Sequence, residues 1–265
     1  MLSTVNPKLA AKEAFRLFCT PPMRYGGASL SGGEELSFQL AGLRIHGNRF
    51  NHPRSKKAMV LHGFSSASGN FADYVSELSE REFEVLAFDA PAHGKSEGKQ
   101  VNALDYMNLI VEAVNRYGPV DVFIAHSFGG LALALALEKI EHSPEIKVVL
   151  IAPATETTSA LKQALQMIGL SNSKLFSAVK DEIKNISGQE ASWFSIRRAI
   201  SNIQAKILWV HDEEDDITPL SDVLPVKNDN PVNVEFLFTK GLGHRKIYRS
   251  GHVKDRIYRF IGGAQ

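Results

Sequence analysis

The stretch VDVFIAHSFGGLALALAL, residues 120–137, decides the fold of this chain. It begins as a nearly continuous apolar run, as in a buried strand, and ends in a Leu- and Ala-rich run that favours a helix. A sharp turn at Ser127 requires small neighbours, which Gly129 and Gly130 provide on the helix side and Ala125 provides less fully on the strand side. Ser127 is therefore either an exposed nucleophile or an ordinary polar residue in a strand-to-helix connection.

The same alternation of strand and helix patterns runs along most of the chain. The predicted strands are 37–47 (two short strands around a turn), 58–61, 84–88, 120–125, 146–152, 206–210 and 232–238. Most are almost continuously apolar, which is typical of a parallel sheet covered on both faces. Apolar residues at helical spacing predict helices over 102–117 and 253–261. The pattern predicts a single α/β domain over residues 1–265, with a mostly parallel twisted sheet flanked by helices.

The interval between the strands at 146–152 and 206–210 is too long for one crossover helix. Helices are predicted at 159–170 and 174–186, and a third is possible at 191–200, so we expect a small helical cap over 155–203. The alternative is a set of extra packing helices without a gating function. Large apolar side chains of this segment could line a pocket or pack on the core: Leu161, Leu165, Met167, Leu175, Phe176, Trp193 and Phe194.

Residues 7–19 predict a short amphipathic helix that Pro21 and Pro22 stop. We expect this helix to fold back on the domain, because amphipathic surface helices are common. A role at a membrane surface is the alternative. The first 22 residues lack the charged start and apolar block of a secretory signal.

Composition excludes several classes of function. The chain has 265 residues, 30 basic and 29 acidic, with a net charge of +1, so no overall field attracts nucleic acid or acidic lipid. No apolar run reaches the about 20 residues of a membrane span, and membrane association is not expected. The single cysteine, Cys19, excludes an internal disulfide and fits a reducing, cytoplasmic location. The nine histidines lack metal-site spacing and the single cysteine gives no thiolate cluster, so no metal is expected. Nothing in the sequence indicates the oligomeric state.

The segment AHSFGG, residues 125–130, resembles the G-x-S-x-G nucleophile elbow of the α/β-hydrolase superfamily. It departs from that motif at Ala125, which replaces the first glycine. The resemblance extends over residues 36–262 and implies the α/β-hydrolase fold with Ser127 as nucleophile. A serine at this position argues against haloalkane dehalogenases and epoxide hydrolases, which use a carboxylate there.

Members of this superfamily carry their catalytic acid after the nucleophile and before the histidine. Residues 211–219, HDEEDDITP, resemble the family segment HGxxDxxxP, and the resemblance implies that Asp215 is the acid. Asp212 and Asp216 remain alternatives because the loop is rich in carboxylates. Glu156, after the preceding strand, is a further alternative.

The segment GLGH, residues 241–244, resembles the family's G-x-G-H and implies that His244 is the general base. His252, eight residues later, is expected on the surface. The segment HGF at 62–64 resembles the family's oxyanion loop and implies that the backbone N–H groups of Phe64 and Phe128 bind the oxyanion. His62 is expected to be structural.

The segment DAPAHGKS, residues 89–96, resembles the family turn D-x-x-G-x-G-x-S, with Asp89, His93, Gly94 and Ser96 at the matching positions. The resemblance implies a structural turn near the active site.

The resemblance implies a serine hydrolase that cleaves a small, mostly apolar carboxylic ester through an acyl-enzyme. Its partner would be a small-molecule acyl substrate, and the implied mechanism needs no organic cofactor. Thioester, lactone, amide and carbon–carbon bond hydrolysis and acyl transfer use the same groups and remain open. A non-catalytic member of the fold that binds a small ligand is the alternative from another class.

Overall fold

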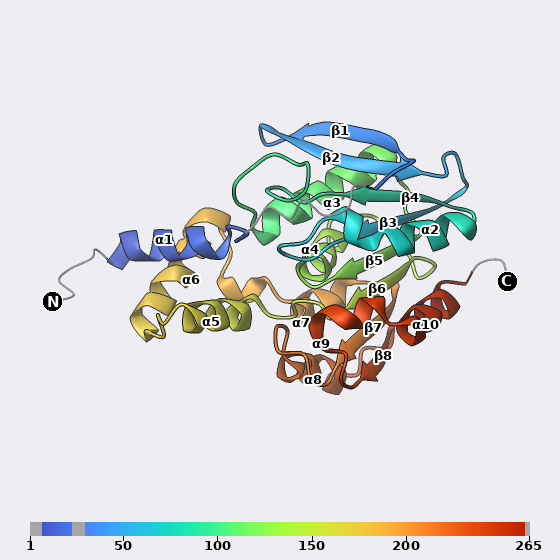
Figure 1. Ribbon diagram of the computed structural model, residues 1–265. Helices are drawn as coiled ribbons and strands as arrows, with labels where there is room; N and C mark the ends of the chain where they lie inside the picture. Colours follow the sequence, from blue (N-terminus) through green and yellow to red (C-terminus); the bar gives the residue numbers. More distant parts are fainter. Residues whose placement is uncertain (1–6, 23–29, 263–265) are drawn as a thin grey trace.

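The computed structural model describes residues 7–22 and 30–262 and centres on one eight-stranded sheet (Figure 1). The predicted strands all form, with ends shifted by a few residues. The strands are β1 (Glu34–Leu40), β2 (Leu43–Phe50), β3 (Lys56–Leu61), β4 (Phe83–Phe88), β5 (Val122–His126), β6 (Lys147–Ile151), β7 (Lys206–Asp212) and β8 (Val234–Thr239).

The sheet has the strand order β1-β2-β4-β3-β5-β6-β7-β8. The pairs β1–β2 and β2–β4 are antiparallel, and every pair from β4 through β3 to β8 is parallel. Strands β4 and β5 are buried along their whole length, and β3, β6 and β7 are buried after their first one or two residues. This burial explains why their sequences are apolar without alternation. The prediction of a mostly parallel α/β sheet is confirmed.

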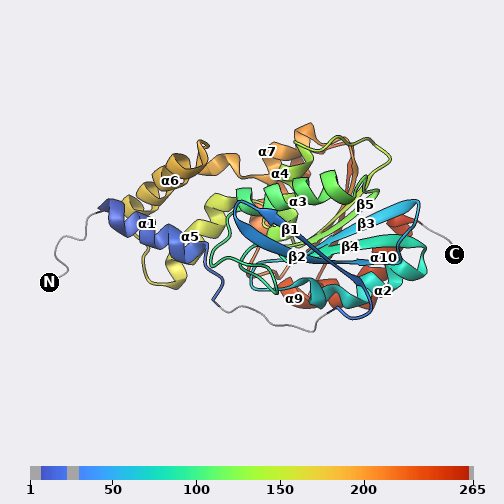
Figure 2. The ribbon, with the colours of Figure 1, turned by 90° about the horizontal axis from the view of Figure 1, so that it is seen from above.

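Helices cover both faces of the sheet, as Figure 2 shows from above. On one side α3 (Ala103–Tyr117) and α4 (Phe128–Leu137) pack on the sheet; α2 (Ala72–Glu80) and α10 (Gly251–Ile261) pack on the other. The predicted helices at 102–117 and 253–261 are therefore present. The remaining helices are α1 (Pro7–Phe18), α5 (Thr157–Met167), α6 (Ser173–Ser187), α7 (Ile196–Ala199), α8 (Leu220–Asn228) and α9 (Gly243–Lys246).

The segment between β6 and β7 forms α5 and α6 as predicted, and the possible third helix at 191–200 is broken into short pieces. Short 3₁₀ turns at 191–193 and 200–202 flank the single turn of α7. The break occurs because Ser195 is extended and pairs with Glu156 in an isolated β-bridge. The hydroxyl of Ser195 then caps α7 by accepting a hydrogen bond from the N–H of Arg198.

Helix α1 folds back and lies beside α5 and α6 at one end of the molecule in both views (Figures 1 and 2). Its Ala11 and Ala14 are buried, which lets the helix approach its neighbours closely. Its C-terminal end is tied to the segment before α3, because the N–H of Val101 donates to the carbonyl of Cys19 at 2.9 Å. This packing agrees with the expectation of a helix folded on the domain. Residues 1–6, the start of the segment that lacks a secretory-signal pattern, lie outside the described residues.

Within the described part of the chain, no helix is long and apolar enough to cross a membrane.

Helix α4 begins in tight contact with the end of β3, and this contact generates a stability prediction. A Cβ atom at Gly129 would lie 2.6 Å from the carbonyl oxygen of His62 and 3.0 Å from that of Leu61. We expect Gly129→Ala to lower the free energy of unfolding by about 1–3 kcal/mol, because backbone atoms would have to shift to relieve the overlap. Urea denaturation followed by circular dichroism measures the change.

Gly251→Ala is the matched control, since no described atom lies within 4 Å of the Cβ position at the start of α10. We expect its unfolding free energy to stay within about 0.5 kcal/mol of wild type. Equal stability of the two variants would contradict the packing argument.

Candidate active site

Ser127 occupies a strained backbone position between β5 and α4. Its φ is 54° and its ψ is −121°, a region that L-residues with side chains seldom adopt. Three backbone hydrogen bonds hold it: its N–H donates to Ile151 at 3.1 Å, and its carbonyl accepts from Gly130 at 2.9 Å and Ala154 at 3.0 Å. These three hydrogen bonds hold Ser127 in its strained conformation. Such strain is typical of functional sites.

The structure brings together Ser127, His244 and Asp215, which follow three different strands. The Nε2 atom of His244 lies 2.9 Å from the Oγ of Ser127. The Nδ1 atom of the same ring lies 2.8 Å from Oδ2 of Asp215. All three residues are more than nine-tenths buried. The arrangement can move a proton from the hydroxyl to the imidazole while the carboxylate steadies the ring.

Asp215 is anchored by its own loop. Its Oδ1 accepts hydrogen bonds from the N–H groups of Ile217 at 2.9 Å and Thr218 at 2.8 Å, and the Thr218 hydroxyl donates to Oδ2 at 2.9 Å. Burial alone would raise the pKa of Asp215, but the bond and charge of His244 and the backbone donors outweigh it and lower the pKa. The group is therefore a carboxylate near neutral pH.

Thr218 is a residue that the sequence did not single out. Its hydroxyl also lies 3.2 Å from Nδ1 of His244 and 3.2 Å from the carbonyl of Ala152. A threonine three residues after a candidate acid can donate hydrogen bonds from both its N–H and its hydroxyl to the carboxylate. This spacing is the sequence signal that could have identified Thr218.

Asp212, one of the candidate acids, contacts the loop that carries His244 rather than the imidazole. Its Oδ2 accepts from the Thr239 hydroxyl at 2.7 Å and from the N–H of Leu242 at 3.0 Å. Burial opposes the charge of Asp212, but these donors outweigh it and lower its pKa. Its position fixes the turn after β8 and therefore the placement of the histidine.

Glu156 and Asp216, the remaining candidate acids, have different surroundings. Glu156 accepts a hydrogen bond from the Ser195 hydroxyl at 2.7 Å, and burial raises its pKa. Asp216 faces the cavity described below. His252, expected on the surface, is exposed. Among the described residues, Asp215 alone of the candidate acids makes a hydrogen bond to the ring of His244.

His126, directly before the serine, supports the backbone of His244. Its Nε2 lies 3.0 Å from the carbonyl oxygen of His244 and must donate to it. The two rings are 4.7 Å apart, and the Tyr248 ring is 4.7 Å from His126 on another side. Burial, with the neighbouring His244, lowers the pKa of His126 to about 3. The ring is therefore a neutral donor, and nothing in the local sequence indicated this contact.

The backbone N–H groups of Phe64 and Phe128 are the predicted oxyanion donors. Within the described parts of the chain, neither N–H has a protein acceptor. The next N–H, that of Ser65, is occupied by Nε2 of His93 at 3.0 Å. The rings of Phe64 and Phe128 meet edge to face at 5.8 Å and line the cavity. The two N–H groups are thus available to a ligand oxygen.

The 62–64 segment is held in place by the turn at 89–96. His62 accepts a hydrogen bond from the N–H of Ala90 on Nε2 at 3.0 Å. Asp89 accepts from the N–H and hydroxyl of Ser68 and from the N–H of Lys95, at 2.8–2.9 Å. These hydrogen bonds agree with the structural function expected for His62 and for the turn at 89–96.

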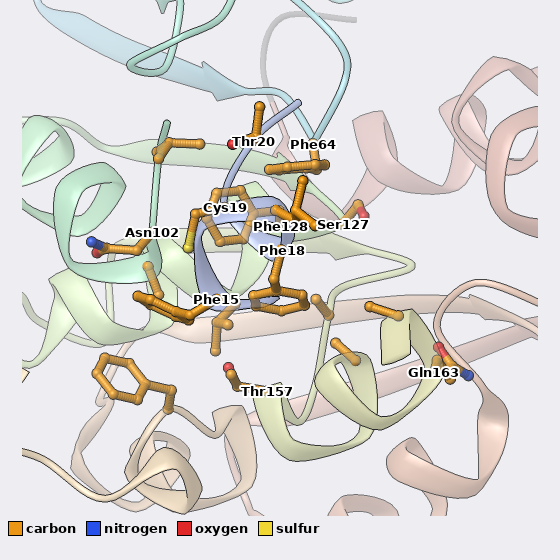
Figure 3. Close-up of a pocket in the computed structure, with 18 of the residues that line it drawn as sticks. Phe15, Phe18, Cys19, Thr20, Phe64, Asn102, Ser127, Phe128, Thr157 and Gln163 are labelled. Carbon is orange, nitrogen blue, oxygen red and sulfur yellow. The ribbon is translucent and has the colours of Figure 1, made fainter. Parts of the chain in front are cut away.

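A cavity of about 640 Å³ opens in front of Ser127 (Figure 3). Its walls come from α1, α5, α6, the start of α3, the loop after β3 and residues 216–218. Its lining is mostly apolar, and Asp216 is the one charged residue that lines it among the described residues. This volume lies within the ~300–1,000 Å³ typical of small-molecule sites.

Some of the apolar side chains proposed for the cap line the cavity, and the others pack in or against the hydrophobic core. Met167 and Phe194 line the cavity. Leu161 and Leu165 are buried in the core, and Leu175, Phe176 and Trp193 pack against it. The sequence did not identify the contribution of α1, which supplies Phe15, Leu17, Phe18 and Cys19 to the lining.

The lowered pKa of His126 generates a pH prediction. Because its pKa falls from about 6.5 in the unfolded chain to about 3 in the folded protein, only the unfolded chain binds this proton between those values. The contribution of neutral His126 to the free energy of unfolding is fully present above pH 6.5 and falls as the pH is lowered toward 3. From pH 7 to 5 we expect a loss of about 2 kcal/mol from His126.

His126→Gln keeps an N–H that can reach the carbonyl of His244 but cannot titrate. Its free energy of urea unfolding should therefore fall by about 2 kcal/mol less than that of wild type between pH 7 and pH 5. His252→Gln, at an exposed histidine, should retain the loss seen in wild type. A loss in His126→Gln as large as in wild type would refute the assignment.

Comparison with known proteins identifies a family that this chain matches. A model of the family described as serine aminopeptidase, S33, matches residues 52–195. An uncharacterized hydrolase, YugF, of Bacillus subtilis (strain 168) is 29% identical over 121 residues, which span 43% of this chain and 42% of that relative. The match thus covers less than half the length of the curated relative.

Solved structures share the fold at low sequence identity. The esterase Pf2001 of Pyrococcus furiosus has a TM-score of 0.68 at 21% identity, covering 92% of this chain and 100% of that one. Est1E of Butyrivibrio proteoclasticus, solved with ferulic acid, has a TM-score of 0.66 at 18% identity, covering 85% and 99%. Because the family match spans more than half of the chain and includes Ser127, the chain belongs to the serine aminopeptidase S33 family and is an enzyme of the α/β-hydrolase superfamily.

Proposed function

We propose that this enzyme hydrolyses carboxylic esters with apolar acyl groups, using Ser127, His244 and Asp215 as a catalytic triad. The observation that carries the proposal is the continuous chain of contacts, 2.9 Å from Oγ to Nε2 and 2.8 Å from Nδ1 to Oδ2. This chain ends at a serine that lines an open apolar cavity. Each contact lies within the ~2.6–3.2 Å expected between nucleophile, base and orienting group.

In the first half of the reaction, the Oγ of Ser127 attacks the ester carbonyl while Nε2 of His244 takes its proton. Asp215 accepts the Nδ1–H of the ring, so the ring keeps the tautomer in which Nε2 is basic. The imidazolium that forms is stabilised by the same carboxylate. The carbonyl oxygen becomes an oxyanion, to which the free N–H groups of Phe64 and Phe128 donate.

Collapse of this intermediate breaks the ester bond. The imidazolium donates its proton to the leaving alkoxide, and the acyl group remains on Oγ. Water then enters, His244 takes a proton from it, and the new oxyanion occupies the same two N–H groups. The acid leaves when the proton returns to Oγ, which restores the free enzyme.

The lining of the cavity supports an apolar acyl group. It is mostly carbon, and Asp216 as its one charged residue would repel a substrate carboxylate. Helices α5 and α6 supply one side of this lining, which supports their function as a cap over the site. Burying the acyl chain there would supply binding energy without specific hydrogen bonds.

An aminoacyl amide is the second candidate, favoured by the description of the family as aminopeptidases. An aminopeptidase must hold a substrate ammonium, and Asp216 is the acidic residue that faces the cavity. Thioesters and lactones, and transfer of the acyl group to an acceptor other than water, would use the same first step.

Removal of the serine hydroxyl is the direct test of the proposal. We expect Ser127→Ala to lower kcat/KM for p-nitrophenyl butyrate by on the order of 10⁴-fold or more, because the variant loses the hydroxyl that lies 2.9 Å from Nε2 of His244. Wild type should also react with a fluorophosphonate probe, and the variant should not. Equal hydrolysis by both proteins would end the catalytic proposal.

The same assay with aminoacyl p-nitroanilides separates the second candidate. Higher kcat/KM for leucine p-nitroanilide than for the ester series would replace the ester assignment with an aminopeptidase. A rise in product yield with added alcohol, at the expense of free acid, would indicate acyl transfer.

The assignment of the acid is tested by Asp215→Asn with Asp216→Asn as the matched neighbour. Asp215→Asn should lower kcat by about 10³–10⁴-fold, because the amide favours the wrong tautomer of His244. Asp216 makes no hydrogen bond to His244, so its variant should change kcat less than about tenfold. A larger effect at Asp216 than at Asp215 would reverse the assignment.

A further inference from the structure

We propose that the N-terminal helix α1 is a specificity element, which walls the acyl cavity and sets the length of the aliphatic acyl chain that the enzyme accepts. The proposal rests on the proposed function for its substrate class. It assigns long-chain aliphatic esters to the site and identifies Phe18 and Phe15 as the side chains that limit chain length.

Helix α1 and the residues just after it contribute a large share of the cavity lining. The contributing residues are Phe15, Leu17, Phe18, Cys19, Thr20 and Pro22. Figure 3 shows Phe15, Phe18 and Cys19 drawn around the same space as Phe128 and Ser127. A chain attached to Ser127 therefore extends into a space that α1 helps to enclose.

The cavity has two aromatic groups, one beside the nucleophile and one on α1. Phe64 and Phe128 meet at 5.8 Å next to the serine. On α1, Phe15 and Phe18 stack at 6.5 Å. The remaining wall between α5 and α6 includes aliphatic side chains such as Ile183. A flexible hydrocarbon chain is the ligand that such a lining fits, because it needs no hydrogen-bond partners.

The thiol of Cys19 does not make the cavity lining more polar. Burial raises the pKa of Cys19 to about 12, with the nearby carboxylate of Asp105 adding to the effect. The group is therefore an uncharged thiol at neutral pH and acts as a small apolar surface of the wall.

Helix α1 is a fixed wall rather than a loosely attached segment. Its Ala11 and Ala14 are buried against neighbouring helices. Two hydrogen bonds tie its end to the segment before α3: the Gln100 amide donates to the carbonyl of Arg16 at 3.0 Å, and the N–H of Val101 donates to that of Cys19 at 2.9 Å. Side chains on a fixed helix can limit the length of the acyl chain, whereas side chains on a loosely attached segment would move aside for a longer one.

This wall lies outside the part of the chain that the family model matches, residues 52–195. The catalytic groups up to Ser127 lie within that part, so nucleophile and wall belong to separate regions of the sequence. The part of the wall that α1 supplies is thus a feature of this chain's N-terminal region.

The test is the hydrolysis of p-nitrophenyl esters from acetate to palmitate, with each kcat/KM divided by that for acetate. Phe18→Ala enlarges the space and should move the optimum to longer chains, and Phe18→Trp should move it to shorter ones. Beyond the wild-type optimum, each additional methylene housed by Phe18→Ala should raise the ratio by up to about fourfold. Phe15→Ala should act in the same direction as Phe18→Ala.

Leu9→Ala is the matched control on the same helix. Leu9 is 63% exposed and does not line the cavity, so its variant should keep the wild-type length profile. An unchanged profile in both Phe18 variants, or the same shift in Leu9→Ala, would overturn the proposal.

A binding measurement separates this proposal from the proposed function. In the Ser127→Ala background, displacement of a fluorescent fatty acid by unlabelled palmitate reports cavity occupancy without hydrolysis. Adding Phe18→Trp should weaken palmitate at least fivefold, and adding Leu9→Ala should change it less than twofold. If the hydrolysis assay fails but this pattern appears, the wall proposal survives alone. If hydrolysis depends on Ser127 while neither profile nor binding responds to Phe18, the wall proposal fails alone.

Discussion

The backbone at Ser127 is the constraint on which the rest of the site depends. A residue with a Cβ atom is held at a φ of 54° because β5 must pass into α4 without an intervening loop. The turn leaves almost no room around it: an added Cβ at Gly63 would lie 2.9 Å from the Cβ of Ser127, and one at Gly130 would lie 2.7 Å from Pro153. Small residues on both sides allow the strained turn, and the turn directs the hydroxyl toward the cavity.

Around this turn, the site is assembled from loops that end neighbouring parallel strands. The carboxyl ends of such strands meet at one edge of a sheet, which is where ligands bind in open α/β folds. Hydrogen bonds within and between these loops hold them in place. Asp212 ties the turn that carries His244, and His126 donates to the carbonyl of His244 from below the nucleophile. The imidazole therefore needs little reorganisation to accept a proton.

The cavity combines parts with different origins in the sequence. Ser127 lies directly after the sheet strand β5, and the insertion between β6 and β7 supplies α5 and α6. Helix α1 precedes the first strand yet lies beside those two helices (Figure 1). The strained turn and much of the cavity wall thus come from separate segments of the sequence.

The sequence by itself determined the strands, the alternation of strand and helix, and the chain order of Ser127, Asp215 and His244. These follow from local patterns: apolar runs mark buried strands, and Gly129 and Gly130 mark a tight turn after Ser127. A resemblance narrowed a loop of five carboxylates to Asp215, while spacing alone left its neighbours open. The catalytic functions of these residues stay predictions, although their geometry agrees with them.

Only the tertiary structure decided the contacts between segments remote in sequence. The break at 191–200 depends on a bridge from Ser195 to Glu156, which no local pattern encodes. The contact of His126 with the His244 carbonyl joins residues 118 positions apart. The cavity wall on α1 required the packing of α1 against α5 and α6, because an amphipathic pattern states that a helix has an apolar face but not what that face covers.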